Sequence, residues 1–337
     1  MTLQELAARL RAARRVLLTT HQVPDGDGAG VELALLQVLE AMGQDVRPVT
    51  VGALPARLRF LPGADRLLDW NRLGSTERAC LLENLDLALV VDMHAWSLLG
   101  PLGEALQSAA LPTYFLDHHP LTTTNAHVVC DPAVSSAGEL CWSLIKLLDR
   151  PVEPNVATCL YAAISYDTNS FKYLRGRPEV HRIAADLLAS GADADAVYRH
   201  LYASQSPRTV AFLSRALCRL QQTPDGTIAW SHVPRPAGSS TDPTRDDFRD
   251  LITHLLEIDG VEVAFTLQED EQDAYKVSLR SMGRTPVDGI ARALGGGGHL
   301  FAAAAQLSGP VDRAAAEIIE RIRAATPPGV DDTPDQG

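Results

Sequence analysis

The sequence lacks the cysteine patterns that build disulfide frameworks or thiolate metal sites. It has five cysteines in 337 residues, and no two of them form a C-x-x-C pair. An odd number of cysteines without paired spacing predicts neither a disulfide framework nor a cysteine-bound zinc ion. Free thiols are typical of proteins in a reducing cytoplasm, which is where we expect this chain to work.

Long apolar runs and an excess of positive charge are also missing. No apolar run reaches the roughly 18 residues of a membrane span, and the N-terminal MTLQELAARLRAARR places leucines at helical spacing among charges, unlike a signal peptide. Lys and Arg number 30 against 42 Asp and Glu, a formal net charge of −12. This balance argues against long duplex nucleic acid and against a membrane surface as partners, and it leaves a short anionic ligand open.

The remaining composition is that of an ordinary globular protein. Hydrophobic residues make up 46% and charged residues 21% of the chain, which excludes disorder, collagen and coiled coil as descriptions of the whole. At about 150 residues per domain, the length suggests two domains. We expect a first domain over 1–190, a helical connector over 191–222, a smaller domain over 223–325 and a disordered tail over 326–337.

Strand-like runs alternate with longer segments in the first half. The runs at 15–20, 45–51, 85–92 and 113–119 are short and apolar, and the segments between them are long enough to cross over a sheet. This alternation predicts a parallel α/β sheet. Ligands bind beyond the carboxyl ends of the strands in such sheets, so the residues that directly follow these runs are candidates for a site.

The chain after residue 119 has a different pattern. Helices are expected at 135–150 and 153–168, and the chain reads as helical from about 179 to 222. The rest predicts a smaller α/β domain. Its expected elements are strands at 227–233, 261–268 and 274–281, a helix at 246–257, a helical pattern broken by four glycines at 289–307, and a last helix at 312–326.

Acidic and imidazole residues gather where the predicted strands end. Five carboxylates buried in one crevice would repel one another, and a fold does not tolerate that unless cations lie between them. Two divalent cations would supply four positive charges. The residues are His21, Asp25 and Asp27 after the first strand, Asp92 after the third, Asp117, His118 and His119 after the fourth, and Asp167 at the end of the helix over 153–168.

The ligand types indicate which ions to expect. Carboxylate and imidazole groups without thiolate favour Mn²⁺, with Mg²⁺, Co²⁺ or Fe²⁺ as alternatives. Two such ions about 3.5–4 Å apart are a known device for activating water and clamping a phosphoryl group. The motif PDGDG alone is equally consistent with a polar loop whose Asp caps a helix, and GDGAG is an incomplete dinucleotide-binding fingerprint.

Six motifs in this order resemble those of the DHH phosphoesterase superfamily. HQVPDGDGAG, VVDMH, FLDHHP and ISYDTNSFKY are similar to its four catalytic motifs, and VSLRS with GGGGHLFAAA is similar to its DHH-associated C-terminal domain. The length and the GGGGH form resemble the nanoRNase branch, which is related to RecJ. The resemblance implies an α/β fold with a parallel-sheet N-terminal DHH domain, a smaller α/β C-terminal domain and an active site in the cleft between them.

The resemblance also implies a role for each candidate residue. Asp117 would orient an imidazole, and His119 would face the scissile phosphate, as the catalytic pair. The metal ligands would be His21 and Asp25 on one ion, Asp27, His118 and Asp167 on the other, and Asp92 bridging the two.

A glycine run in the second domain is the candidate phosphate site. Glycines that open a helix let main-chain N–H groups approach an anion, although a flexible hinge is the more common meaning of such a run. Arg280 and Ser281 precede it with a cation and a hydroxyl. We expect substrate binding at Arg280, Ser281, Gly296, Gly297, Gly298 and His299.

Other polar and aromatic residues have ordinary interpretations. The four tryptophans are expected to pack in cores, and His94 is among the histidines expected to be plain surface or core groups. The chain departs from the family pattern at Ala95 and Leu98, where relatives often have Asp and Arg, and at Asn169 and Lys172. None of these four is an expected ligand.

The function expected from these observations is hydrolysis of phosphate esters by two metal ions. The resemblance implies short oligoribonucleotides of two to five nucleotides as substrates, together with adenosine 3′,5′-bisphosphate (pAp). A phosphodiesterase for cyclic di-AMP or pApA is the rival within the class, and a non-catalytic nucleotide sensor is the rival from another class. Cleavage polarity is open, and so is a homodimer.

Overall fold

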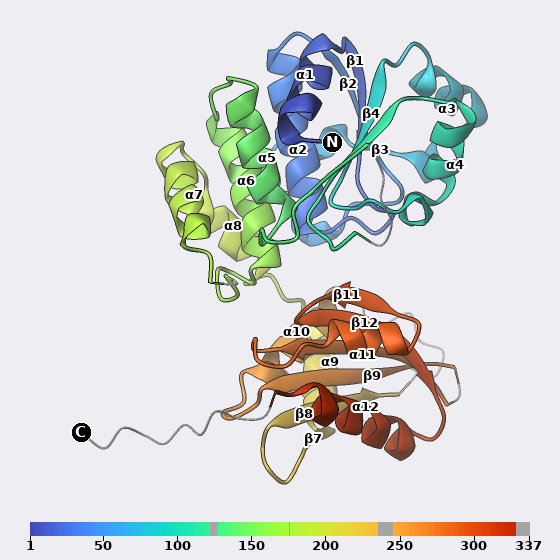
Figure 1. Cartoon of the computed structure of the whole chain (residues 1–337), viewed down its shortest axis with the longest axis vertical. Helices are drawn as coiled ribbons and strands as arrows, with labels where there is room; N and C mark the ends of the chain where they lie inside the picture. The colour runs from blue at the N-terminus through green and yellow to red at the C-terminus, as the bar shows by residue number, and fades with distance from the viewer. Residues whose placement is uncertain (122–126, 175, 235–244, 272, 328–337) are drawn as a thin grey trace. The chain divides into compact units, whose positions relative to one another are not determined.

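The computed structural model describes residues 1–121, 127–174, 176–234, 245–271 and 273–327. The chain divides into two compact units, Met1–Ser204 and Gln205–Gly337, which are described separately (Figure 1). The loop expected at 234–244 and the tail expected at 326–337 lie almost entirely outside the described residues.

The first unit is built on a six-stranded parallel sheet. The strand order is β3-β2-β1-β4-β5-β6, so β1 lies in the middle and the chain moves outward from it in both directions. Each neighbouring pair is parallel, as the alternation of elements predicted. The strands are β1 (Arg15–Thr19), β2 (Asp45–Thr50), β3 (Leu68–Asp69), β4 (Leu87–Val91), β5 (Thr113–Asp117) and β6 (Val128–Cys130).

Helices cover both faces of this sheet, because its strands are apolar on both sides. Leu18 of β1 packs into a core formed with one set of helices, while the next residue back, Leu17, packs into a separate core on the opposite face. The first set is α1 (Leu3–Ala12), α2 (Gly26–Ala41), α5 (Ala137–Leu147), α6 (Pro154–Asp167), α7 (Pro178–Ala189) and α8 (Ala194–Leu201), and the second is α3 (Ser75–Leu82) and α4 (Gly100–Ser108) (Figure 1).

Close contact between α2 and α6 places two of the expected ligands. A Cβ atom at Gly30 would lie 2.6 Å from the carbonyl oxygen of Cys159, so only glycine lets the two helices approach this closely. Asp27 lies in the first turn of α2 and Asp167 is the last residue of α6, as expected from the sequence. The packing of these helices therefore brings the two carboxylates to the same end of the sheet.

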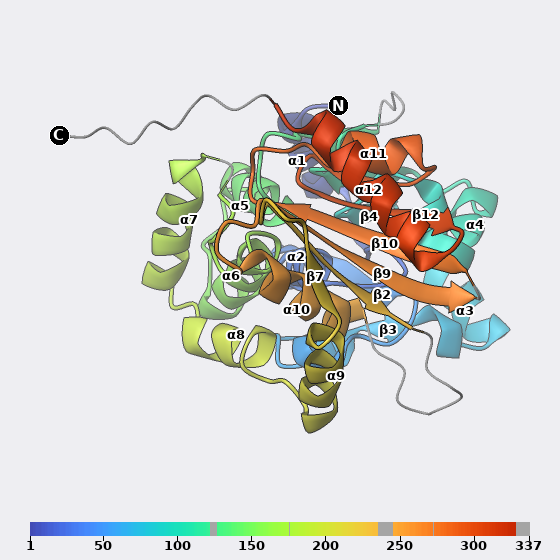
Figure 2. The ribbon, with the colours of Figure 1, turned by 90° about the horizontal axis from the view of Figure 1, so that it is seen from below.

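The second unit contains a mixed sheet with helices on both faces (Figure 2). The strand order is β11-β12-β10-β9-β8-β7, and only β8 and β9 pair in parallel. The elements are α9 (Pro207–Leu217), β7 (Leu220–Gln222), β8 (Ile228–Val233), α10 (Arg245–Leu256), β9 (Val263–Glu271), β10 (Ala274–Ser281), α11 (Asp288–Ala293), β11 (Gly297–His299), β12 (Ala302–Ser308) and α12 (Val311–Ala325).

Side chains on alternate positions of the sheet form the two cores of this unit. Trp230 stacks on Phe265 at a centroid distance of 5.6 Å and packs with α12, which confirms the packing role expected for this tryptophan. Ala229, one residue earlier, faces α10 on the other side. The smaller α/β domain predicted from the sequence is therefore confirmed.

Two local predictions in this region are wrong. The helical pattern expected over 289–307 ends with α11 at Ala293, and the four glycines open no helix, because residues 297–299 form strand β11 and residues 302–308 form strand β12. A Cβ atom at Gly296 would lie 2.0 Å from the carbonyl oxygen of Ala304, so the close pairing of β11 with β12 requires glycine there. Residues 220–222, expected in the helical connector, form strand β7 because they pair with β8.

No helix among the described residues combines the length and apolarity that crossing a bilayer would need.

Glu32, on α2, is an unusual group in the first core. Its side chain is fully buried, and neither carboxyl oxygen has a hydrogen-bond partner in the described structure. Burial raises the pKa of Glu32 well above its ordinary 4.5, and the nearby main chain of Val49 only partly offsets this effect. The folded protein therefore binds a proton that the unfolded chain releases above about pH 4.5, so the energetic penalty for Glu32 grows with pH.

Replacing Glu32 with an apolar residue should stabilise the protein. We expect Glu32→Met to raise the free energy of unfolding by about 1–3 kcal/mol at pH 7, because it removes a buried group without partners. The gain should shrink toward pH 4.5, where the unfolded chain also takes up the proton and only the cost of burying an uncharged carboxyl remains. Thermal denaturation across pH 4 to 8 measures this, with the exposed Glu104→Met as control. A gain independent of pH would contradict the assignment of a protonated Glu32.

Candidate metal centre

The loop after β1 turns directly into α2, and Asp25 caps that helix. The Asp25 Oδ1 atom accepts hydrogen bonds from the main-chain N–H groups of Asp27 and Gly28, at 3.2 and 3.3 Å. The capping interpretation of PDGDG is therefore correct, but capping is not the only contact of the Asp25 side chain. The same oxygen lies 3.7 Å from Nε2 of His21, which is four residues earlier on the loop.

Asp27 is fully buried and is held by the first turn of another helix. Its Oδ2 atom accepts the N–H of Ala137 at 2.6 Å, and its Oδ1 atom accepts the N–H of Gly138 at 2.9 Å. These amides belong to the N-terminus of α5, where main-chain donors and the helix dipole favour a negative charge. Burial and the neighbouring Asp92 and Asp167 nevertheless raise the pKa of Asp27 well above its ordinary value.

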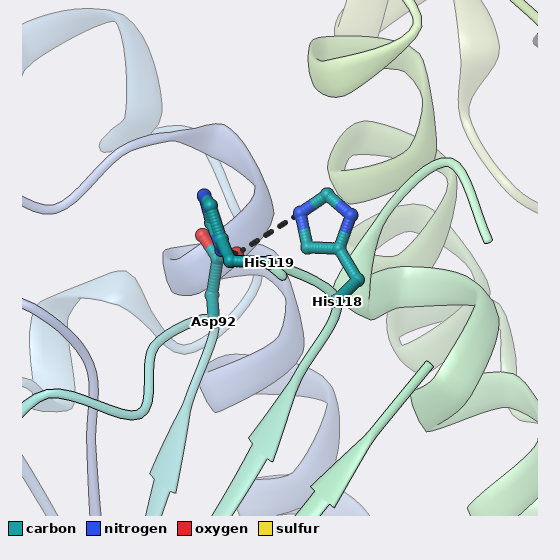
Figure 3. Close-up of side chains that lie close together, drawn as sticks. All are labelled: Asp92, His118 and His119. Atoms are coloured by element: carbon teal, nitrogen blue, oxygen red, sulfur yellow. Dashed lines mark ion pairs between the residues drawn. The ribbon is translucent and has the colours of Figure 1, made fainter. Parts of the chain in front are cut away.

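Asp92 follows β4 in a left-handed backbone conformation, with φ of 61°. Aspartate adopts this conformation more readily than most residues, and it occurs often at functional sites. The side chain is almost completely buried. It points from the end of β4 toward His118 and His119 at the end of β5 (Figure 3).

The two oxygens of Asp92 face two different groups of residues. Oδ1 lies 3.4 Å from Nε2 of His118, which is also 3.7 Å from Asp27 and 3.2 Å from Asp167. Oδ2 lies 3.6 Å from Nε2 of His21. The ligand atoms of His21, Asp25 and Asp92 lie within 4.8 Å of one another, and so do those of Asp27, His118 and Asp167. The structure thus brings together all six expected ligands, and Asp92, His118 and His119 form a third group whose ligand atoms lie equally close.

These groups have the chemistry of a metal site. Oxygen and imidazole nitrogen are typical ligands of Mn²⁺ and similar ions. Oδ1 of Asp92 is buried without a hydrogen-bond partner among the described residues, which is costly for a carboxylate unless a cation is bound. Burial opposes a charged imidazole at His21, but Asp25 and Asp92 outweigh it and raise its pKa to about 10. The residues therefore fit a metal ion.

Asp117 is a different kind of carboxylate. It is fully buried, and its Oδ1 atom accepts hydrogen bonds from the N–H of His118, the N–H of His119 and the Nδ1 atom of His119. Its Oδ2 atom accepts one from Nδ1 of His94. Burial alone would raise the pKa of Asp117, but these donors lower it well below its ordinary value. Asp117 thus hydrogen-bonds the His119 ring, and among the described residues it belongs to no candidate metal group.

His94 is the site residue that sequence reasoning missed. It was expected to be an ordinary polar group, yet it contacts Asp117 directly. The sequence placed it at the end of the motif VVDMH, two residues after Asp92, without indicating what it contacts. Nothing in that spacing shows that the loop turns back toward the end of β5.

The predicted substrate residues of the second unit lie on β10 and on or just before β11, the two strands that flank β12. Arg280 on β10 and His299 on β11 both pair with Ala302 on β12, so their main chains form one row across the sheet. The side chain of His299 lies outside the described part of the chain. A Cβ atom at Gly297 would meet nothing within 4 Å, whereas one at Gly298 would lie 2.4 Å from the carbonyl oxygen of Ala302.

Ser281 is engaged within the protein. It is buried, and its hydroxyl donates a hydrogen bond to Oε1 of Glu262 at 3.0 Å. The same oxygen accepts the N–H groups of Arg284 and Thr285, so Glu262 fixes the loop after β10. The role of Ser281 toward a substrate stays a prediction.

Comparison with known proteins identifies the family. Residues 15–164 match the N-terminal domain of the DHH family, and residues 230–326 match the DHHA1 domain. A relative from Thermus thermophilus, the bifunctional oligoribonuclease and PAP phosphatase NrnA, is 30% identical over 91% of this chain and 89% of its own. The chain belongs to the DHH family. The predicted DHH phosphoesterase is thereby confirmed as a hydrolase, with the metal motifs of the family in the first unit.

Two further proteins extend the comparison. The cyclic-di-AMP phosphodiesterase GdpP of Bacillus subtilis is 29% identical over 92% of this chain, which spans only about half of GdpP (47%). The structure of an exopolyphosphatase-related protein from Bacteroides fragilis has the same fold, with a TM-score of 0.84 and 24% identity, covering 95% of this chain and 94% of its own.

Substitution of Asp92 should separate metal binding from folding. We choose Asp92→Asn, because Asn keeps the shape and tolerates the left-handed backbone. Without metal, the variant should be more stable than the wild type by on the order of 1 kcal/mol, since one buried like charge is gone. With Mn²⁺ at about 100 times the dissociation constant, the wild type should gain about 2.7 kcal/mol and the variant much less.

Thermal denaturation with and without Mn²⁺, combined with metal analysis of the dialysed proteins, measures both effects. Gln107→Asn serves as the control, because Gln107 lies on α4, which covers the face of the sheet opposite α2 and α5. Equal metal content in Asp92→Asn and the wild type would rule out Asp92 as a ligand.

Proposed function

We propose that this chain is a two-metal phosphoesterase that degrades short oligoribonucleotides to mononucleotides and also dephosphorylates pAp. The observation that carries the proposal is the geometry of Asp92, whose two oxygens face separate groups of carboxylate and imidazole ligands. In our proposal, His21, Asp25 and Asp92 hold one ion, and Asp27, His118, Asp167 and Asp92 hold the other.

The ligand set supports Mn²⁺ as the ion, with Mg²⁺, Co²⁺ or Fe²⁺ as alternatives, because it combines carboxylates with imidazoles and contains no thiolate. When bound, such a pair supplies activation of water and stabilisation of charge on the phosphoryl group.

The protein contributes the orientation of the groups around the reaction. The amides of α5 fix the Asp27 carboxylate, so this ligand cannot rotate away when the site is empty. Asp117 receives the Nδ1–H of His119, which turns Nε2 of that ring away from Asp117. About a third of the His119 side chain is exposed, so a substrate can reach it. As an imidazolium, His119 would donate a hydrogen bond from Nε2 to a phosphate oxygen there; burial opposes this charged form, but Asp117 and Asp92 outweigh it and raise the pKa of His119.

Two features support a short, phosphate-bearing substrate. The formal charge of −12 disfavours a long polyanion, and the row formed by Arg280, Ala302 and His299 carries one cation, two residues along the strands from Gly297, where a Cβ atom would meet nothing within 4 Å. We infer that this row binds a terminal phosphate. The name of the Thermus relative, an oligoribonuclease and PAP phosphatase, agrees with such substrates.

Hydrolysis of cyclic di-AMP or pApA is the second candidate, supported by the similarity to GdpP.

All five cysteines are free thiols, which is compatible with a cytoplasmic enzyme.

A substrate panel tests the proposal. With Mn²⁺ present, we expect diribonucleotides and pAp to be hydrolysed with kcat/KM at least roughly tenfold above that for cyclic di-AMP. Chromatography of pAp, pApA, cyclic di-AMP and RNA and DNA of two to ten nucleotides measures this. Faster turnover of cyclic di-AMP would favour the second candidate. Binding without turnover of any substrate, by folded and metal-loaded protein, would indicate a nucleotide sensor.

A pair of glycine variants tests the phosphate row. Gly297→Ala should fold normally, since its Cβ meets nothing within 4 Å, and should raise KM for phosphate-bearing substrates by crowding the approach. Gly296→Ala should instead lower the melting temperature of the second unit, because its Cβ overlaps Ala304. An unchanged KM in the folded Gly297→Ala variant would remove Gly297 from the proposed phosphate site.

A further inference from the structure

A buried carboxylate between two imidazoles lies beside the candidate metal centre. Asp117 is fully buried, and nine-tenths of the His94 side chain is buried with it. The carboxylate joins rings from two loops, His94 after β4 and His119 after β5. The His94 ring has no role in the proposed function described so far.

The division of donors between the two Asp117 oxygens shows what His94 contributes. Oδ1 receives all three hydrogen bonds from the chain that immediately follows, namely the two amides and the His119 ring. Oδ2 receives its hydrogen bond from Nδ1 of His94 and from no other described residue. Without His94, a fully buried carboxylate would have one oxygen with no donor, which is costly.

The orientation of the Asp117 carboxylate in turn affects the orientation of the His119 ring. The rotation of Asp117 about its χ2 angle determines whether Oδ1 is in line with Nδ1 of His119. With only Oδ1 held, the carboxylate could turn to find a donor or water for Oδ2. With both oxygens held, the His119 ring is fixed with Nδ1–H toward Asp117 and Nε2 away from it.

We propose that His94 is a positioning residue, acting through Oδ2 of Asp117 to hold the His119 ring for the substrate phosphate. It makes no metal group with the other candidate ligands in the described structure. The proposal rests on the proposed function, since His119 can act only if this site hydrolyses phosphate esters. In this proposal, Nδ1 of His94 is the atom that makes the hydrogen bond to Asp117.

Two amide substitutions distinguish the two ring nitrogens of His94. The side-chain nitrogen of asparagine, bonded to Cγ, lies close to the place of Nδ1, whereas that of glutamine lies closer to Nε2. His94→Ala should lower kcat for a diribonucleotide roughly 10- to 100-fold, the usual effect of removing a group that orients a catalytic residue. His94→Asn should recover most of the loss, and His94→Gln should recover little.

Metal content and a control variant exclude simpler causes. All three variants should retain the wild-type Mn²⁺ content, because His94 is not a ligand. His254→Asn, at a half-exposed histidine of the second unit, should leave kcat unchanged. Recovery by His94→Gln but not by His94→Asn would overturn the proposal in favour of a direct contact through Nε2. An unchanged kcat in His94→Ala would overturn it outright.

A spectroscopic measurement tests the proposal independently of activity. In the Mg²⁺-loaded protein, ¹⁵N–¹H correlation spectra of the imidazoles should show His119 protonated at Nδ1, with that proton protected from exchange. The signal should persist in His94→Asn and broaden or disappear in His94→Ala. A sharp, unchanged His119 signal in His94→Ala would contradict the role of His94. If the wild type hydrolyses no substrate, the proposed function fails while this spectrum still reports on the imidazole pair.

Discussion

Electrostatic repulsion among buried carboxylates is the constraint on which the first unit depends. Asp27 and Asp92 are both buried, Asp167 is close to them, and the pKa of Asp27 is raised by both neighbours. His118 lies within 4 Å of all three and relieves part of the repulsion: burial opposes its charged form, but the carboxylates outweigh burial and raise its pKa. The fold could have avoided this arrangement with apolar residues at lower cost. Retaining it is understandable if the charge is neutralised by metal ions that the chemistry requires.

The protein treats its buried carboxylates in two ways, and the difference explains their roles. Asp117 has donors on both oxygens and a lowered pKa, so it is electrostatically satisfied by the protein alone and serves to orient imidazoles. Asp92 keeps an oxygen without a donor in the described structure, so it is available as a ligand. Asp27 lies between these extremes, because the amides of α5 fix its position without removing its capacity to bind a cation.

Sequence reasoning was most reliable where periodicity and strand ends carry the information. The parallel sheet followed from the alternation of elements, and the ligands followed from the rule that sites lie at the carboxyl ends of strands. It was wrong for the glycine run, because pairing of β11 with β12 overrides the local pattern and requires Gly296 for close approach. It missed His94, because a contact between two loops depends on the path of the chain after Asp92, which spacing does not encode.

Anomalous diffraction at the manganese edge, from crystals grown with Mn²⁺, tests the central claim most directly. We expect two peaks, one beside Oδ2 of Asp92 with His21 and Asp25, and one beside Oδ1 with His118 and its neighbouring carboxylates. The absence of both peaks, with these side chains in the same positions, would contradict the account, because the buried carboxylates would then coexist without the cations we invoke to explain them.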